Sequence, residues 1–385
     1  MGCTSICELL QEFLSTLNEK SLFCYSVGGQ EKKLMRVSKV SITKYPRGKM
    51  SVVSSRRIPR VFRFLSQQLT KLSVLKKSYL DILRLTSLPT ESEDPSKISD
   101  PPTIDLLMVL HHKDIWIART TLAMAVKNSH NTVSSITIVA TSLACNLLKE
   151  IPIQIDEVNS NIPIEVINEN EFVPYEIARR CGESGNASGW LLQQAIKMLY
   201  VIRTNTPGTL VIDSDTIILN PICWLTKEGR SPIFANWHKD DPKILEFLKI
   251  TKPIMGSEFN LVSHFMLFKS GILRSLLNNL NTRSSGYHEL TDFSELWKPD
   301  MAYLEKMLED TIFHFGNEMS EYNLYGKFAL NYDESNCELL RWSNIEVRTN
   351  DLNSISLQEL IERHSKSYMS LSIHIHHFED TNLEK

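Results

Sequence analysis

Short apolar runs alternate with helical segments through the second part of the chain. Residues 104–110 (IDLLMVL) form a continuous apolar run of strand length, and 135–140 and 163–167 are two further runs of this kind. The segments between them, 114–129 and 143–150, have the length and composition of helices. Strands that are apolar on both faces and alternate with helices indicate a parallel sheet that is covered on both sides. The sequence therefore predicts an α/β fold, doubly wound, with a mainly parallel sheet and helices on both faces.

A further predicted strand contains two acids. The helix expected over 188–203 leads directly into 209–218 (TLVIDSDTII), where Asp213 and Asp215 come late in an otherwise apolar run. Residues i and i+2 of a strand project from the same face, so the two carboxylates are expected to converge, and they stay close even if the strand frays into a loop. Ligands of open parallel sheets collect outside the carboxyl ends of the strands. We therefore expect the site at this end of the sheet.

The first part of the chain is organised differently. Residues 1–86 predict helices, and residues 87–102 (SLPTESEDPSKISDPP) read as a linker because they are rich in proline, serine and acids. The predicted division is a helical N-terminal extension, a linker, and a domain over 103–385. No internal repeat is visible, and neither GxGxxG nor a P-loop motif follows any predicted strand, which argues against dinucleotide-binding and P-loop proteins.

Composition sets broad limits on the class of protein. The chain has 385 residues, of which 42% are hydrophobic and 23% charged, as in globular proteins. It has no apolar run of membrane-spanning length, and acids stand where a signal peptide is apolar, so a cytoplasmic protein is expected. The 7 cysteines form no C-x-x-C pair, so neither a disulfide framework nor a zinc site is predicted.

The formal net charge of -3 hides a basic region. Residues 32–77 contain many lysines and arginines and no acid. Such a region can contact the inner face of an anionic membrane, a charged acceptor or nucleic acid, and it can also be the solvated face of a helix. The intervening residues are mainly aliphatic rather than aromatic, so nucleic acid has the weakest support of these alternatives.

Two carboxylates this close in an apolar setting are unfavourable unless a cation or a proton lies between them. Mg²⁺ and Mn²⁺ prefer carboxylate oxygens and keep coordination positions that substrate phosphates can fill. The same spacing of acids occurs at 91–93 and 169–171, but neither pair ends an apolar strand that continues into another apolar run. We therefore predict that Asp213 and Asp215 bind a divalent metal, Mn²⁺ or Mg²⁺.

Two kinds of enzyme use a metal in this position. In phosphatases of the haloacid dehalogenase type, the first acid of D-x-D-x-[TV] is a nucleophile on the first strand. Here Ile217 occupies the Thr/Val position, and three predicted strands come earlier. In sugar transfer from nucleotide diphosphates, the metal joins the acids to the leaving diphosphate. The sequence favours a metal-dependent glycosyltransferase, with a metal-dependent phosphohydrolase and a non-catalytic nucleotide-binding module as alternatives.

Four segments in order resemble the motifs of a bacterial family of GT-A-fold glycosyltransferases, mostly catalogued as a domain of unknown function. They are 189–198 (GWLLQQAIKM), 211–221 (VIDSDTIILNP), 263–268 (SHFMLF) and 320–328 (SEYNLYGKF). The resemblance covers about residues 103–345 and implies a mixed, mainly parallel GT-A sheet, a nucleotide-sugar donor, and metal and diphosphate binding by the D-x-D acids. It also suggests a saccharide or lipid-linked acceptor in surface polysaccharide or lipopolysaccharide assembly. The chain departs from the usual motifs at Ser214, Ser263 and Met319.

Further site residues are predicted on the helix before the metal strand and in the later motifs. Lys197 and Gln194 are expected near the donor phosphates, although an amphipathic packed helix explains them equally well. Glu321 is the candidate base or acceptor contact, and the alternative is a first-turn acid in a helix capped by Ser320. The predicted substrate contacts are Trp190, Gln193, His264, Tyr322 and Tyr325.

A late segment offers a third metal ligand. In 372–377 (SIHIHH), His374 and His376 are expected on one face of a strand. Either can complete the metal site, and both can equally belong to an exposed terminal strand. The sequence gives no preference among His374, His376 and the neighbouring His377.

Overall fold

The computed structural model describes residues 84–90, 100–150, 161–185, 188–236, 243–250, 256, 258–284, 300–315, 320–348, 352 and 355–374. All of them belong to one of the two compact units of the chain, Leu69–Lys385. The helices expected before residue 84, the basic residues of 32–77, Met319 and His376 lie outside the described residues. The division of the chain at residues 86 and 102 also stays a prediction. Leu85, next to the first of these boundaries, is buried in the core of this unit.

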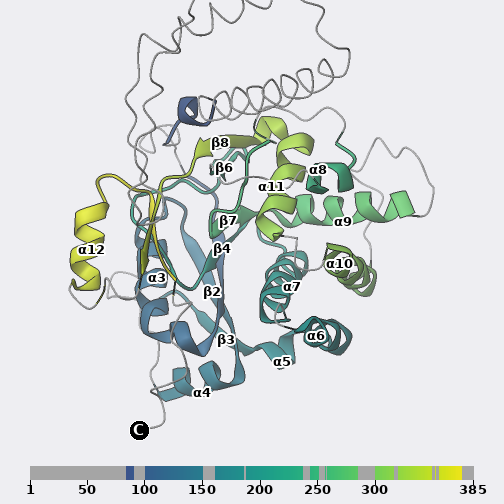
Figure 1. Ribbon diagram of the computed structural model, residues 1–385, viewed down its shortest axis with the longest axis horizontal. Coiled ribbons are helices and arrows are strands. Elements are labelled where there is room, and N and C mark those ends of the chain that lie inside the picture. The colour runs from purple at the N-terminus through teal and green to yellow at the C-terminus, as the bar shows by residue number, and fades with distance from the viewer. Residues whose placement is uncertain are drawn as a thin grey trace, which may run out of the picture. The chain divides into compact units, whose positions relative to one another are not determined.

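A five-stranded sheet lies at the centre of the described part of the chain (Figure 1). Its order is β3 (Ile164–Asn168), β2 (Val133–Ala140), β1 (Ile104–Leu110), β4 (Thr209–Asp213) and β7 (Phe265–Phe268). The first four are parallel to their neighbours, and β7 is antiparallel to β4. The structure therefore confirms the predicted mixed, mainly parallel sheet.

Both faces of this sheet are buried. Leu107 and Val211 face a core that includes residues of α7 (Ser188–Arg203), α9 (Ser270–Ser284), α10 (Met301–Phe315) and α11 (Glu321–Tyr332). The neighbouring residues Leu106 and Ile212 face a second core with α3 (Ile115–Lys127) and α4 (Ser142–Glu150). Because alternate residues of β1, β2 and β4 need apolar partners on opposite sides, these strands are mainly apolar, whereas the edge strand β3 is partly exposed.

The order of the strands fixes where a ligand can bind. From β1 the chain builds β2 and β3 on one side, and it then returns to place β4 on the other side of β1. Such a switch point opens a crevice outside the carboxyl ends of the two strands. In this chain those ends are Leu110 and Asp213.

The strand predicted over 209–218 is in fact two strands in different sheets. β4 ends at Asp213, a turn follows, and β5 (Thr216–Ile218) pairs with β10 (Ser370–His374), which also pairs with β9 (Asn344–Arg348). The prediction of one continuous strand with both acids on one face was therefore wrong. Thr121 donates to the Ser214 carbonyl at 3.0 Å, and the Ser214 hydroxyl donates to Asp114 at 2.8 Å, so the turn is held by side chains from outside the strand.

The remaining elements are shorter or peripheral. They are η2 (His112–Asp114), α5 (Glu169–Phe172), α6 (Tyr175–Gly182), β6 (Ser231–Ala235), α8 (Lys243–Phe247), η6 (Glu334–Asn336), β8 (Cys337–Arg341) and α12 (Leu357–His364). β6 and β8 form a parallel pair. Among the described helices, none combines the length and apolarity needed to cross a membrane.

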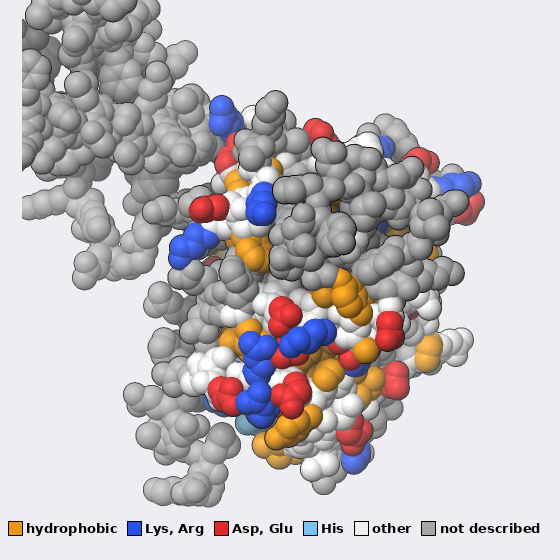
Figure 2. All heavy atoms as spheres, turned by 90° about the vertical axis from the view of Figure 1, so that its right-hand side faces the viewer, with side chains coloured by type: hydrophobic (Ala, Val, Ile, Leu, Met, Phe, Trp, Pro, Cys, Tyr) orange, Lys and Arg blue, Asp and Glu red, His pale blue; other side chains and the backbone are white. Residues whose placement is uncertain are grey.

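Charged side chains of both signs gather on the surface turned to the viewer in Figure 2. On α6 and α10, Arg180 Nη1 lies 2.6 Å from Glu309 Oε1, and Lys306 Nζ lies 3.1 Å from Glu309 Oε2. The Arg180 guanidinium also lies 3.9 Å from the centre of the Phe313 ring. These contacts join the two helices at the surface.

Candidate functional site

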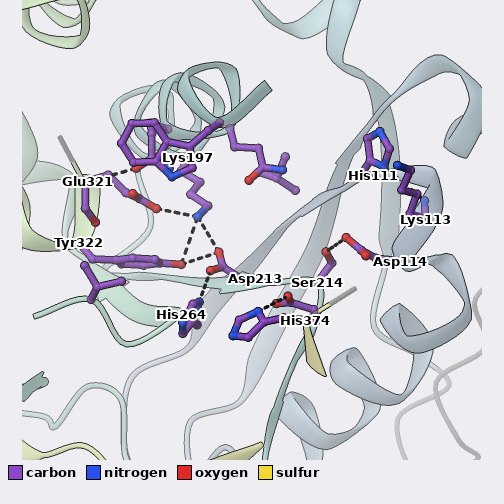
Figure 3. A pocket seen from close by; sticks show the side chains of 17 residues that line it. His111, Lys113, Asp114, Lys197, Asp213, Ser214, His264, Glu321, Tyr322 and His374 are labelled. Carbon is purple, nitrogen blue, oxygen red and sulfur yellow. Dashed lines mark hydrogen bonds and ion pairs between the residues drawn. The ribbon is translucent and has the colours of Figure 1, made fainter. Parts of the chain in front are cut away.

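A cavity of about 590 Å³ opens at the carboxyl ends of β1 and β4 (Figure 3). The predicted site residues that line it come from α7, the β4–β5 turn, the segment before β7, the start of α11 and the end of β10. They are Trp190, Gln193, Gln194, Lys197, Asp213, Asp215, His264, Glu321, Tyr322 and His374. The fold therefore brings these predicted residues into one cavity, although the first and the last, Trp190 and His374, are 184 positions apart in the sequence.

Lys197 forms a buried ion-pair cluster with two acids. Its Nζ lies 2.6 Å from Asp213 Oδ1 and 2.6 Å from Glu321 Oε1, and the residue is 3% exposed. Burial alone would lower the pKa of Lys197, but the carboxylates of Asp213 and Glu321 outweigh burial and raise it. Lys197 is therefore a cation that lies between the two acids as their shared counter-charge.

Both oxygens of Asp213 have partners within the protein. Oδ1 also accepts a hydrogen bond from the Tyr322 hydroxyl at 3.0 Å, and Oδ2 lies 3.0 Å from His264 Nδ1. Burial would raise the pKa of Asp213, but Lys197 and His264 hold this pKa well below its usual range. Asp213 is thus ionised and fixed in orientation.

Glu321 is the first residue of α11 and is 1% exposed. Burial raises its pKa, although Lys197 opposes the shift. Its backbone N–H donates to Gln194 Oε1 at 2.9 Å, whereas Ser320 makes no side-chain capping bond. A carboxylate that is buried and bonded to a lysine is poorly placed to take a proton from an acceptor, so the geometry favours Glu321 as the group that holds Lys197, and Gln194 as the partner that caps α11.

Asp215 and His374 form a second pair at the cavity. Asp215 Oδ2 lies 3.3 Å from His374 Nδ1, and the two side chains are 22% and 25% exposed. The Ile373 N–H donates to the Asp215 carbonyl at 2.9 Å, which ties the turn to β10. The hydrogen bond with Asp215 raises the pKa of His374. These two side chains remain accessible from the cavity.

The side chains of the cavity include ligands that a divalent metal could use. Among the described residues, no group of three or more His, Cys, Asp and Glu side chains is arranged to hold a metal ion. Asp215 and His374 nevertheless supply one carboxylate and one imidazole, and Mg²⁺ is commonly bound by one or two carboxylates with water and substrate phosphates as further ligands. The donor set therefore fits a metal site that the substrate completes, centred on Asp215 and His374. Both oxygens of Asp215 have partners too, His374 and Thr216, but only at 3.3 Å. Asp213 fits the metal site less well because it is ion-paired with Lys197 at 2.6 Å and bonded to Tyr322 and His264 at 3.0 Å.

Three residues after β1 line the cavity but were not predicted. They are His111, Lys113 and Asp114. Burial and the nearby charges of Asp215 and Asp213 raise the pKa of Asp114, while its bond with Ser214 opposes the shift. The sequence did hold a signal, because HHKD follows the strand that pairs with β4 and therefore ends at the same edge of the sheet.

His264 has an unusual backbone conformation. Its φ is 60°, in the left-handed region that non-glycine residues rarely adopt. Its carbonyl accepts the Asp213 N–H at 2.9 Å, and its ring centre lies 5.4 Å from those of Trp342 and His374. These contacts maintain the conformation and place the imidazole between the two halves of the site.

Tyr325 does not belong to the cavity. It is 1% exposed, its hydroxyl accepts the Lys269 N–H at 2.8 Å, and its ring centre lies 4.3 Å from that of Phe268. The prediction that Tyr325 contacts substrate is corrected here, because α11 is buried and this ring packs in its core.

No protein-family model and no curated protein sequence matches the chain. The resemblance to the bacterial family therefore stays a prediction. Among solved structures, the chain is similar to the mannosyltransferase Ktr4p from S. cerevisiae, with 9% identity, 70% of this chain and 78% of that chain covered, and a TM-score of 0.45. The same mannosyltransferase in complex with GDP has 8% identity over 69% and 78% of the two chains and a TM-score of 0.42. Mouse xyloside xylosyltransferase 1 has 12% identity over 70% and 97%, with a TM-score of 0.34.

Proposed function

We propose that this chain is a glycosyltransferase that uses a nucleotide-diphosphate sugar and a divalent metal, Mn²⁺ or Mg²⁺. The observation that carries the proposal is the meeting of Asp215 and His374 beside Asp213, at the carboxyl edge of the β1–β4 switch point and inside a cavity of about 590 Å³. A carboxylate and an imidazole in this place can hold a metal that shares its other positions with a diphosphate.

Different residues of the cavity are suited to bind the diphosphate and the sugar of the donor. When bound, the metal stabilises the charge that develops on the leaving diphosphate. Lys113 is exposed at the cavity and supplies a further cation for phosphate. Asp213 is held by Lys197 and keeps the turn that carries Asp215 in place. Trp190 is 38% exposed and offers, with Gln193, a flat apolar surface beside an amide, which suits a sugar ring.

The geometry does not favour the phosphohydrolase. In that reading Asp213 attacks phosphorus, which requires a free carboxylate oxygen. Both of its oxygens are engaged, one by Lys197 and Tyr322 and the other by His264. Its strand is also the fourth along the described chain rather than the first.

The acceptor belongs to the same proposal. A saccharide or lipid-linked acceptor, and a role in surface polysaccharide or lipopolysaccharide assembly, are supported by the sequence resemblance. A cytoplasmic location with peripheral membrane contact through residues 32–77 is supported by the composition and the basic region.

A donor screen tests the proposal. The full chain is incubated with UDP-, GDP- and dTDP-linked sugars together with Mn²⁺, Mg²⁺ or EDTA, and released nucleoside diphosphate is measured. We expect release with one carrier, dependence on metal, and loss of release in Asp215→Asn but not in Asp310→Asn, which changes an exposed acid on α10. Release of inorganic phosphate from simple phosphoesters, with no nucleoside diphosphate from any donor, would instead support a phosphohydrolase.

A further inference from the structure

A second cavity lies apart from the one described above. It has a volume of about 840 Å³, and its walls come from the end of β8, the turn between α12 and β10, the segment after β5 and the segment after α3. Met369 lines this cavity and His374, at the far end of β10, lines the first. A strand rises about 3.3 Å per residue, so these two positions are about 17 Å apart. A ligand in the second cavity is therefore distinct from a donor diphosphate in the first.

Two cations from different segments face this cavity. They are Arg341 at the end of β8 and Lys366 after α12, and none of the described residues that line the cavity is an acid. Within the described part of the chain, neither of these side chains forms an ion pair or a hydrogen bond. Like charges around one cavity repel each other, and an anion between them removes that cost.

The walls between the cations are fixed and offer further donors. Asn220 donates to the Tyr368 carbonyl at 2.7 Å, and the Met369 N–H lies 3.0 Å from the Ser343 hydroxyl, so the segments are tied to one another. The hydroxyls of Thr90, Ser343 and Ser367 line the same space. Guanidinium, ammonium and hydroxyl groups around one space are the groups that bind phosphate oxygens.

The floor of the cavity is apolar. Ile222, Phe234, Leu340 and Met369 contribute to it and are all buried. An apolar floor below a cationic rim suits a ligand that joins a phosphate group to a carbon skeleton. We propose that this second cavity is a binding site for a phosphate-bearing ligand, with Arg341 and Lys366 as its main cationic contacts.

Inorganic phosphate is the first probe. The full chain is titrated by calorimetry in EDTA, with sodium chloride at matched ionic strength as the reference. We expect Arg341→Gln/Lys366→Gln to weaken phosphate binding roughly tenfold or more, since hydrogen bonds between charged groups are stronger than those between neutral groups. The matched control, Lys127→Gln/Arg363→Gln, removes the same charge from exposed positions on α3 and α12 outside the cavity and should bind as the unmodified chain does.

The source of the phosphate is distinguished by a second probe. Vesicles of phosphatidylcholine, with or without phosphatidylglycerol, are sedimented with each variant. If Arg341→Gln/Lys366→Gln loses only the phosphatidylglycerol-dependent binding to vesicles, the ligand is a lipid headgroup. If it loses only the binding of inorganic phosphate, the ligand is a free phosphate compound. Either result supports the proposal. If this double variant matches the control with both probes, or if Asp215→Asn abolishes phosphate binding, the proposal is overturned. Asp215→Asn changes only the first cavity, so a failure of the glycosyltransferase proposal can be told apart from a failure of this one.

Discussion

Lys197 and Glu321 are 124 positions apart in the sequence, and their side chains meet inside the protein at 2.6 Å. The same ammonium group lies 2.6 Å from Asp213. Both acids of the D-x-D motif line the cavity, but Asp213 is the ion-pair partner of a buried lysine, while Asp215 is paired with His374. The two acids have different surroundings and, in our account, different roles.

Removing the cation of this cluster should destabilise the protein. Lys197→Met leaves Asp213 and Glu321 close together without their shared counter-charge. Breaking a buried ion pair from one side costs about 3–5 kcal/mol, and we expect a decrease of this size in the free energy of unfolding, measured with urea at neutral pH.

Two variants control this measurement. Lys306→Met removes an exposed lysine paired with Glu309 and should change the free energy of unfolding by less than about 1 kcal/mol. The double variant Lys197→Met/Glu321→Gln removes one of the two unpaired carboxylates and should recover part of the loss. If Lys197→Met unfolds at the same urea concentration as the unmodified chain, the cluster does not stabilise the fold.

Glu321→Gln separates a catalytic base from a group that holds Lys197. General bases contribute about 10²–10⁴-fold to the rate. Because Glu321 is 1% exposed and bonded to Lys197, we expect its amide variant to lower kcat by less than about tenfold and to keep the shape of the pH profile. The check is kcat against pH for sugar transfer. A decrease of a hundredfold or more together with loss of the acidic limb, where activity falls as a general base is protonated, would restore Glu321 as the base.

The ion pair of Arg180 and Glu309 should make stability depend on pH. Burial alone would raise the pKa of Glu309, but Arg180 and Lys306 outweigh burial and lower it below the usual 4.5. The unfolded chain then binds more protons, so the stabilisation is present above about pH 4.5 and is lost as the pH falls through the lower folded pKa. We expect Arg180→Gln to lose stability at neutral pH and to show a smaller further loss on acidification.

Urea unfolding at neutral pH and below about pH 4.5 measures this difference. Arg363→Gln, which breaks an exposed pair with Glu359 on α12, is the control and should follow the unmodified chain. Parallel losses of stability in Arg180→Gln and the unmodified chain would show that the pair does not account for this pH dependence.

The order of the strands from β1 to β4, with α3, α4 and α7 between them, could be predicted from the sequence because the inner strands of a covered parallel sheet are apolar on both faces. The short helices α5 and α6 were not predicted. α7 begins and ends where the pattern placed it, at residues 188 and 203. The break after Asp213 could not be predicted, because Thr216–Ile218 is as apolar as the strand before it and pairs with β10, about 150 positions later. A local pattern contains no information about that partner.

The site was predictable in part for the same reason. The position of the D-x-D acids late in a predicted strand indicated the edge of the sheet at which the site lies. The order of strands and helices along the chain indicated a doubly wound sheet, in which such a site is expected. The engagement of Asp213 by Lys197, Tyr322 and His264 depends on how three distant segments pack, which spacing along the chain does not determine. Tyr322 and Tyr325 lie on one helix that is buried along its first ten residues, so periodicity could not tell the ring at the cavity from the ring in the core.

Binding of Mn²⁺ tests the central claim most directly. Free Mn²⁺ is measured by electron paramagnetic resonance during titration of the full chain, with and without UDP or GDP, in the unmodified protein, Asp215→Asn, His374→Gln and the control Asp310→Asn. We predict that one nucleoside diphosphate tightens Mn²⁺ binding in the unmodified protein and the control, and that this coupling is lost in Asp215→Asn and His374→Gln. Equal coupling in all four proteins would contradict the assignment of Asp215 and His374 as the residues that hold the metal.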